Sequence, residues 1–368
     1  MHSGRRVAQT SCCDPRTFRS RGAWLVALLT VLATAATGAA AQIPSAGATS
    51  ASDSQSGAIA LRGGVYMLTV GGVNVAVQTG ADGLIVVDTG PAGGAAGLLQ
   101  QIRQLSERPI RFLIDTNADG ELIGGNAAVA EAGQSLATTD TFDALEVNGN
   151  TSKVSLPGQG NTAVVIARQN VLTQMLAEPG ANYASAALPS DTFTRKQFNF
   201  FLDGSPIAVV SLPAGHSGSD AAVRFDRPDV VVSGAVFDQT RFPVIDVADG
   251  GSIEGEIEAL DEIANTLSYA HVPVLQNSGA TLIIPVRGPV SDEDDLVTYR
   301  DMVATVRDRI EYYLGQGKTL EQVRALNPAR GYRSRYGADS GSWTTQDFID
   351  AIYRSLAARR KGHPGPPS

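Results

Sequence analysis

Residues 114–126 read IDTNADGELIGGN, and this stretch decides how the fold of the chain is interpreted. The apolar residues 112–114 before the turn are typical of a buried strand, and the glycines at 124–125 open a helix-like segment. The turn between them carries four polar residues, Asp115, Asn117, Asp119 and Glu121. Binding and catalytic side chains are often carried by such loops, so the turn is a candidate functional site.

Strand-like and helix-like segments alternate on both sides of this turn. Residues 65–79 form two β-rich runs around Gly71-Gly72, as in a hairpin, and the run GLIVVDTG at 83–90 adds a third strand. Further strands are expected at 110–114, 163–167, 206–212, 221–225, 230–232 and 281–286, and helices at 95–106, 125–132 and 253–267. The alternation predicts a layered α/β domain.

Four stretches together resemble the metallo-β-lactamase superfamily. In that family a strand ends in T-H-x-H-x-D-H-x-G-G, where this chain has TNADGELIGG at 116–125. LIVVDTG (84–90) resembles the family's strand before its first helix, and LPAGHSGSD (212–220) and VVVSGAVFD (230–238) resemble later family segments in the same order. Residues 281–303 resemble a secreted or periplasmic branch of metallo-hydrolases. The resemblance implies an α/β fold, an αββα four-layer sandwich with a helical C-terminal extension.

The resemblance also implies a metal site, but most of its ligand positions are changed. The first zinc site would need three histidines, and the chain has Asn117, Asp119 and His216. The second would need two carboxylates and two histidines, and the chain has Glu121, Leu122, Ala235 and Arg287. A leucine and an alanine donate no ligand atom, and a guanidinium stays charged and repels a divalent ion. We therefore expect Arg287 to replace the metal and to pair with Asp119 or Glu121.

The candidate pocket residues are Asn117, Asp119, Glu121, His216, Asp220 and Arg287. Asp220 lies in a turn, where aspartate commonly caps backbone groups, so a structural role is expected for it. A single histidine at a ligand position cannot build a dizinc centre, and no cofactor is expected.

Three functions are compatible with this pattern. The leading hypothesis is a non-catalytic pseudoenzyme that binds a small molecule or a protein. The alternative is a hydrolase of an ester, lactone or amide with one divalent ion (Zn²⁺, Mn²⁺ or Mg²⁺) on Asp119, Glu121 and His216. A metal-free reaction with Glu121 or His216 as general base is the third.

The first 41 residues have the pattern of a secretory signal peptide. Five arginines precede an apolar stretch at 23–33, and three alanines at 39–41 offer a cleavage site. The stretch is shorter than the roughly 20 residues of a spanning helix, which disfavours the alternative of an uncleaved anchor. Both cysteines, Cys12 and Cys13, lie in this leader. We expect a secreted or periplasmic protein with no stable membrane span after cleavage.

The remaining chain divides into four further parts. Residues 42–58 are expected to be a flexible linker and 59–291 the metallo-β-lactamase-like domain, with a surface insertion at 133–160. Residues 292–358 show apolar positions at helical spacing and form the C-terminal helical extension, and 359–368 a disordered tail. Cleavage would remove five of the 29 Lys and Arg and one of the 37 Asp and Glu, leaving a formal charge of −12. An acidic chain without a basic patch argues against a nucleic-acid partner.

Export should leave a mature chain that starts at or near Gln42, because the small residues before it suit signal peptidase. Intact-mass measurement of protein recovered from the medium or periplasm tests this. A mass that still includes Trp24 would contradict it.

Overall fold

Two β-sheets lie at the centre of the structure, a computed structural model that describes residues 57–135, 162–180, 182–268 and 279–362. All of these belong to one compact unit, Ser50–Ser368. The predicted leader, most of the linker and of the 133–160 insertion, and residues 363–368 lie outside the described residues. No helix in the described ranges has the length and apolar composition needed to cross a membrane.

The first sheet has seven strands that follow one another in space as in the sequence: β1 (Ile59–Ala60), β2 (Val65–Val70), β3 (Val73–Thr79), β4 (Leu84–Val87), β5 (Ile110–Asp115), β6 (Val164–Arg168) and β7 (Asp191–Phe193). β2 and β3 form the predicted hairpin, with Val70 opposite Val73. Gly71 and Gly72 both have positive φ angles, which explains the two glycines at the turn. From β4 onwards the strands are parallel, so the ends of β4 and β5 meet at one edge.

The second sheet has five strands in the spatial order β12 (Leu282–Ile284), β11 (Val230–Val232), β10 (Ala221–Phe225), β9 (Ser205–Ser211) and β8 (Gln197–Leu202). Strands β8 to β11 are antiparallel, and β12 runs parallel to β11. Side chains from both sheets form one buried apolar layer between them, in which Phe112 of β5 contacts Phe200 of β8. The two sheets therefore pack face to face.

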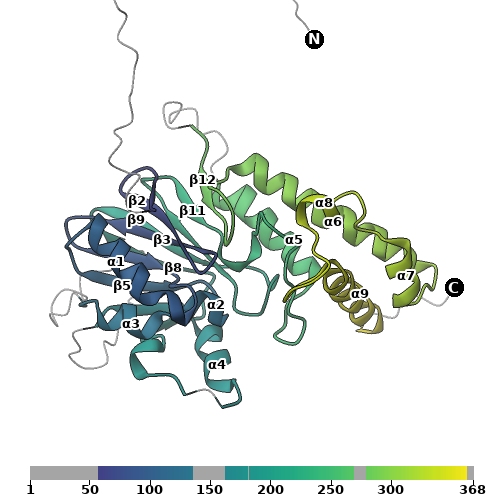
Figure 1. Ribbon diagram of the computed structural model, residues 1–368, viewed down its shortest axis with the longest axis horizontal. Coiled ribbons are helices and arrows are strands. Elements are labelled where there is room, and N and C mark those ends of the chain that lie inside the picture. The colour runs from purple at the N-terminus through teal and green to yellow at the C-terminus, as the bar shows by residue number, and fades with distance from the viewer. Residues whose placement is uncertain (1–56, 136–161, 181, 269–278, 363–368) are drawn as a thin grey trace, which may run out of the picture. The chain divides into compact units, whose positions relative to one another are not determined.

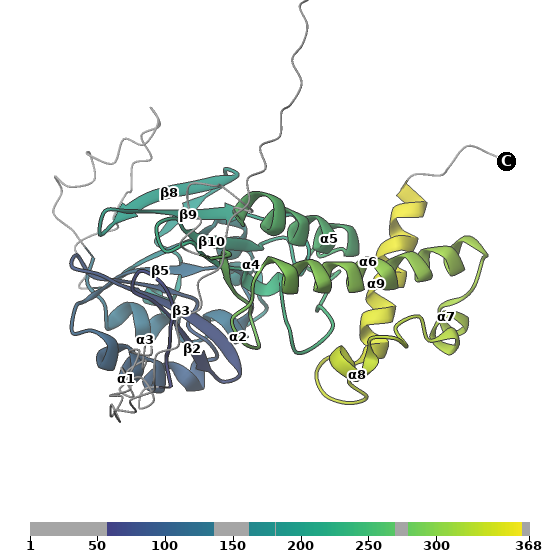
Figure 2. The same ribbon diagram turned by 90° about the horizontal axis from the view of Figure 1, so that it is seen from above.

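Helices cover the outer face of each sheet, as Figures 1 and 2 show. On the first sheet these are α1 (Ala95–Leu105) and α3 (Asn126–Glu131), which share a buried cluster with β2 to β6. The short helices α2 (Gly120–Ile123) and α4 (Gln169–Ala177) lie at the end of the strands, next to the candidate site. The result is the predicted αββα order of layers.

The second sheet is covered by α5 (Ile253–Glu262), whose last turn continues as a π-helical segment, Ile263–Leu267. The C-terminal region adds α6 (Glu293–Gly315), α7 (Leu320–Leu326), α8 (Arg333–Tyr336) and α9 (Thr345–Gly362). Side chains of α5, α6 and α9 belong to the same buried cluster as those of β9 and β10. The C-terminal helices thus pack on α5 and share one continuous core with the second sheet.

Phe348→Ala should test this shared core. Phe348 of α9 is fully buried and stacks on Phe242 with ring centroids 4.6 Å apart. Removing a buried phenylalanine costs about 3–5 kcal/mol, so urea unfolding should show a large loss of stability in one cooperative transition. Tyr312→Ala is the control, because that side chain is exposed and its loss should change stability by less than about 0.5 kcal/mol. A separate early transition of the C-terminal helices would contradict the shared core.

Candidate functional site

The turn after β5 is organised by its own polar side chains. Asn117 Oδ1 accepts a hydrogen bond from the Asp119 backbone N–H at 2.9 Å. Asp119 is the N-cap of α2, and its Oδ1 accepts from the backbone N–H of Glu121 at 3.0 Å. Both are ordinary uses of Asn and Asp in turns and at helix starts. Oδ2 of Asp119 is left pointing away from the cap.

Asn117 connects this turn to the loop between β9 and β10. Its side-chain Nδ2 donates to Asp220 Oδ1 at 2.6 Å and to Ser217 Oγ at 2.9 Å. Asp220 also accepts from the backbone N–H groups of Gly215 and Ser217. Burial raises the pKa of Asp220, while these donors and His216 act in the opposite direction. Asn117 and Asp220 are both buried and lie behind the pocket rather than in its wall.

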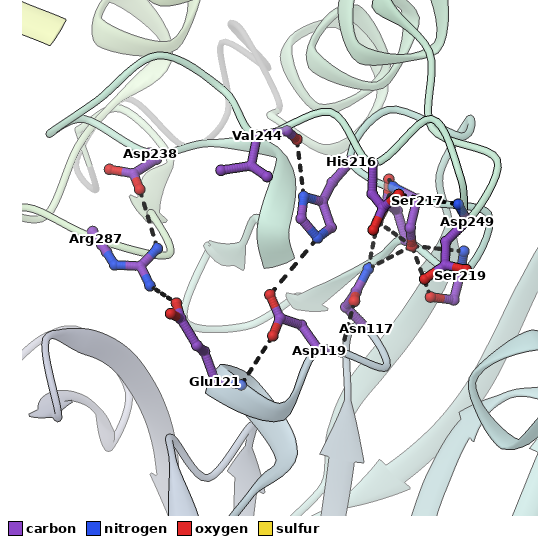
Figure 3. A network of polar contacts seen from close by, with 12 residues as sticks. Asn117, Asp119, Glu121, His216, Ser217, Ser219, Asp238, Val244, Asp249 and Arg287 are labelled. Atoms are coloured by element: carbon purple, nitrogen blue, oxygen red, sulfur yellow. Dashed lines mark hydrogen bonds and ion pairs between the residues drawn. The ribbon is translucent and has the colours of Figure 1, made fainter. Parts of the chain in front are cut away.

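His216 is held with one ring nitrogen towards the pocket (Figure 3). Its Nδ1 lies 2.9 Å from the carbonyl oxygen of Val244. A carbonyl only accepts, so Nδ1 carries a proton, and the neutral form of the ring has its lone pair on Nε2. Nε2 lies 3.8 Å from Asp119 Oδ2, which is beyond hydrogen-bond distance.

Arg287, which follows β12, lies between two carboxylates in Figure 3. It forms an ion pair with Glu121 and a second with Asp238, at 3.2 Å from Oδ2. Asp238 also accepts from Nε of Arg241 at 3.0 Å. The backbone keeps these groups in register, because Asp238 and Arg287 form a β-bridge. The expected pairing of Arg287 is confirmed with Glu121, whereas Asp119 faces His216.

A pocket with about 290 Å³ of empty space lies between these groups and is open to solvent. Its wall is formed by Asp119, Glu121, Leu122, His216, Ala235, Asp238, Arg241, Val244, Val286 and Arg287. Four of the six candidate residues therefore come together here, together with the altered positions Leu122 and Ala235. Asp238 and Arg241 were missed from the sequence, although Asp238 ends the VVVSGAVFD stretch.

The metal centre that the fold family implies does not fit these residues. Within the described ranges no group of three or more His, Cys, Asp or Glu side chains is placed to hold a metal ion. Two of the family's ligand positions in the wall, Leu122 and Ala235, are apolar, and the guanidinium of Arg287 is already paired with Glu121 and Asp238. His216 is the one histidine among the described residues; His2, His271 and His363 lie outside them.

Two buried carboxyl groups lie beneath the turn. Asp88 accepts from the backbone N–H and the hydroxyl of Thr116, at 2.9 and 2.7 Å. Both carboxyl oxygens of Asp115 accept hydrogen bonds from the side-chain amide of Asn126. Burial raises the pKa of Asp88 to about 7, and burial followed by the charge of Asp88 raises that of Asp115 well above its usual range. These groups fix the strand ends that carry the site.

Another carboxyl group lies under the His216 loop. Glu256 of α5 is fully buried, and neither of its oxygens has a hydrogen-bond partner in the described part of the chain. Burial and the nearby charge of Asp220 raise its pKa well above the usual value. The carboxyl group approaches Gly215 so closely that a Cβ there would lie 2.5 Å from its Oε2. A glycine is therefore required at this point of the loop.

Comparison with known proteins gives structural neighbours only: no family profile matches the sequence, and no curated protein does. The sec-alkylsulfatase Pisa1 from Pseudomonas sp. is similar over 84% of this chain and 51% of its own, with a TM-score of 0.55 and 12% identity. A double mutant of that enzyme gives a TM-score of 0.55 at 13% identity, with the same coverage. A metallo-β-lactamase from Pontibacter korlensis matches 67% of this chain and 98% of its own, with a TM-score of 0.46 and 15% identity. The chain spans about half the length of the alkylsulfatase.

The similarity to the alkylsulfatase, the layer order and the position of the pocket at the strand ends define the fold. The protein has the α/β fold of the metallo-β-lactamase superfamily, with a helical C-terminal region. At 12% identity the similarity concerns the fold, so function has to be argued from the site.

Asp88→Asn should weaken the dependence of stability on pH. The folded pKa of about 7 lies above the ordinary 3.8, so folded Asp88 keeps its proton where the unfolded chain releases it. The contribution of Asp88 to the free energy of unfolding is complete below about pH 4 and is lost as pH rises through about 7. Urea unfolding at about pH 5 and about pH 8 should show a smaller difference in the variant than in the wild type. Asp301→Asn, at an exposed position, is the control, and an unchanged pH difference in Asp88→Asn would contradict the assignment.

Proposed function

We propose that this metallo-β-lactamase-fold protein is a non-catalytic binding or scaffold protein whose zinc site has been replaced by ion pairs. The supporting observation is the position of Arg287, which pairs with Glu121 and Asp238 inside the pocket. A guanidinium at this place supplies the positive charge that the carboxylates would otherwise draw from a metal. The ligand would be a small molecule or a protein.

Electrostatics explains why the replacement is stable. Two carboxylates close together repel each other, and a cation between them offsets this repulsion. Arginine suits this position because its planar fork donates to two carboxylates at once. A metal ion entering the pocket would have to displace this cation or accept its repulsion. The same group that stabilises the pocket therefore lowers its metal affinity.

A rival proposal is a hydrolase of an ester, lactone or amide that holds one divalent ion on Asp119, Glu121 and His216. The observation in its favour is the hydrogen bond from His216 Nδ1 to the Val244 carbonyl. Metal-binding histidines commonly donate from one ring nitrogen and bind through the other. An oxygen-rich set of this kind would suit Mn²⁺ or Mg²⁺ better than zinc. Against it, Glu121 already pairs with Arg287.

Purified wild-type protein should contain well under one equivalent of zinc, manganese or magnesium, as measured by elemental analysis after gel filtration. Addition of EDTA should leave the thermal midpoint unchanged, because an ion that is not bound contributes no stabilisation. The triple variant Leu122→His, Ala235→Asp, Arg287→His serves as a positive control and should bind zinc more tightly than the wild type. Stoichiometric metal together with an EDTA-sensitive esterase or lactamase activity would favour the hydrolase.

A further inference from the structure

The charges in the wall of the pocket do not cancel. Three carboxylates, those of Asp119, Glu121 and Asp238, face two guanidinium groups, those of Arg241 and Arg287. The two arginines are engaged by Glu121 and Asp238. Within the described ranges Asp119 has no ion pair with Lys or Arg, and its closest basic atom is His216 Nε2 at 3.8 Å. One negative charge is left at the inner side of the pocket.

Hydrogen-bond acceptors collect at the same place. Asp119 Oδ1 caps α2, which leaves Oδ2 towards His216. His216 is nine-tenths buried, and its Nε2 has a lone pair but no hydrogen bond within the described structure. Glu121 accepts the hydrogen bond from Arg287 through Oε2, so its Oε1 remains available as an acceptor. The pocket thus offers three acceptors and one uncompensated negative charge.

We propose that the pocket binds the primary ammonium group of a small organic cation. An ammonium group has one positive charge and three N–H donors, which match the charge and the three acceptors. A trimethylated ammonium group has no N–H to donate to these acceptors, and a phosphate would add negative charge next to Asp119. Leu122, Ala235, Val244 and Val286 provide an apolar wall for the carbon chain next to the ammonium group.

The inference rests on the proposed binding function and names its ligand class. An anionic ligand would have to separate Arg287 from Glu121 and would leave the charge of Asp119 uncompensated. A divalent ion would bring two positive charges close to the guanidinium of Arg287, so it would meet about twice the repulsion of an ammonium group. An ammonium group leaves the ion pairs of Arg287 in place, and its single charge is matched by that of Asp119.

The test is calorimetric titration of EDTA-treated, dialysed protein with n-butylammonium chloride, with tetramethylammonium chloride and sodium butyrate as comparison ligands. We expect saturable one-to-one binding of n-butylammonium alone. Asp119→Asn keeps a capping oxygen for α2 but removes the charge, and it should weaken binding by about tenfold or more, as expected for loss of an ionic hydrogen bond. Asp301→Asn on the exposed face of α6 changes the net charge equally and should leave binding unchanged.

A second measurement follows binding in the wild type and does not depend on the folding of Asp119→Asn. In the wild type, the imidazole nitrogen signals of His216, assigned with His216→Asn, should shift as n-butylammonium is added and should not shift with butyrate. Absence of binding, equal binding of tetramethylammonium, or full affinity in Asp119→Asn would overturn the inference. The proposed function fails on a different result, namely a stoichiometric metal with chelator-sensitive turnover, so the two outcomes can be distinguished.

Discussion

The hydrogen bond from Asn117 to Asp220 is the contact on which the site depends. It joins the turn after β5, in the first sheet, to the loop before β10, in the second, and the backbone N–H of Ala221 adds a bond to the Thr116 carbonyl at 2.8 Å. Asp220 is fully buried, so loss of its donors would leave a carboxylate without solvation, which is costly. The pocket keeps its shape because two sheets are fixed to each other at this point.

On the proposed function, the residues around that fixed point would be the supporting shell of a metal centre whose ion has been replaced. In metalloproteins a carboxylate commonly accepts a hydrogen bond from a ligand histidine and orients it. Asp220 here accepts from Asn117, which the sequence resemblance aligns with a ligand histidine. On this proposal the partner of the ligand is kept while the ligand differs, and the positive charge comes from Arg287. Such a combination preserves the geometry of the strand ends and changes what they can bind.

The sequence was sufficient to predict most of the fold and some of the residues that line the site. Apolar runs and the glycine turn at 71–72 predicted most of the strands, because buried strands leave a clear pattern. The edge strand β8 and the short helix α4 were missed: β8 buries only some of its side chains, and α4 buries only Val171 and Met175. Asp238 and Arg241 were missed because their role depends on the turn that brings them to Arg287, and no local pattern encodes that distance.

The C-terminal helices determine how long apolar surface stays exposed while the chain is being synthesised. Helix α5 lies on the second sheet, and its own apolar side chains are covered by α6 and α9, which are made last. Until residues near Leu356 have left the ribosome, the apolar side chains of α5 lack this cover, and such surfaces attract chaperones and proteases. A chain that ends early would expose this face of α5 permanently. Quality control would therefore recognise an incomplete molecule from this exposed face, before any ligand enters the pocket.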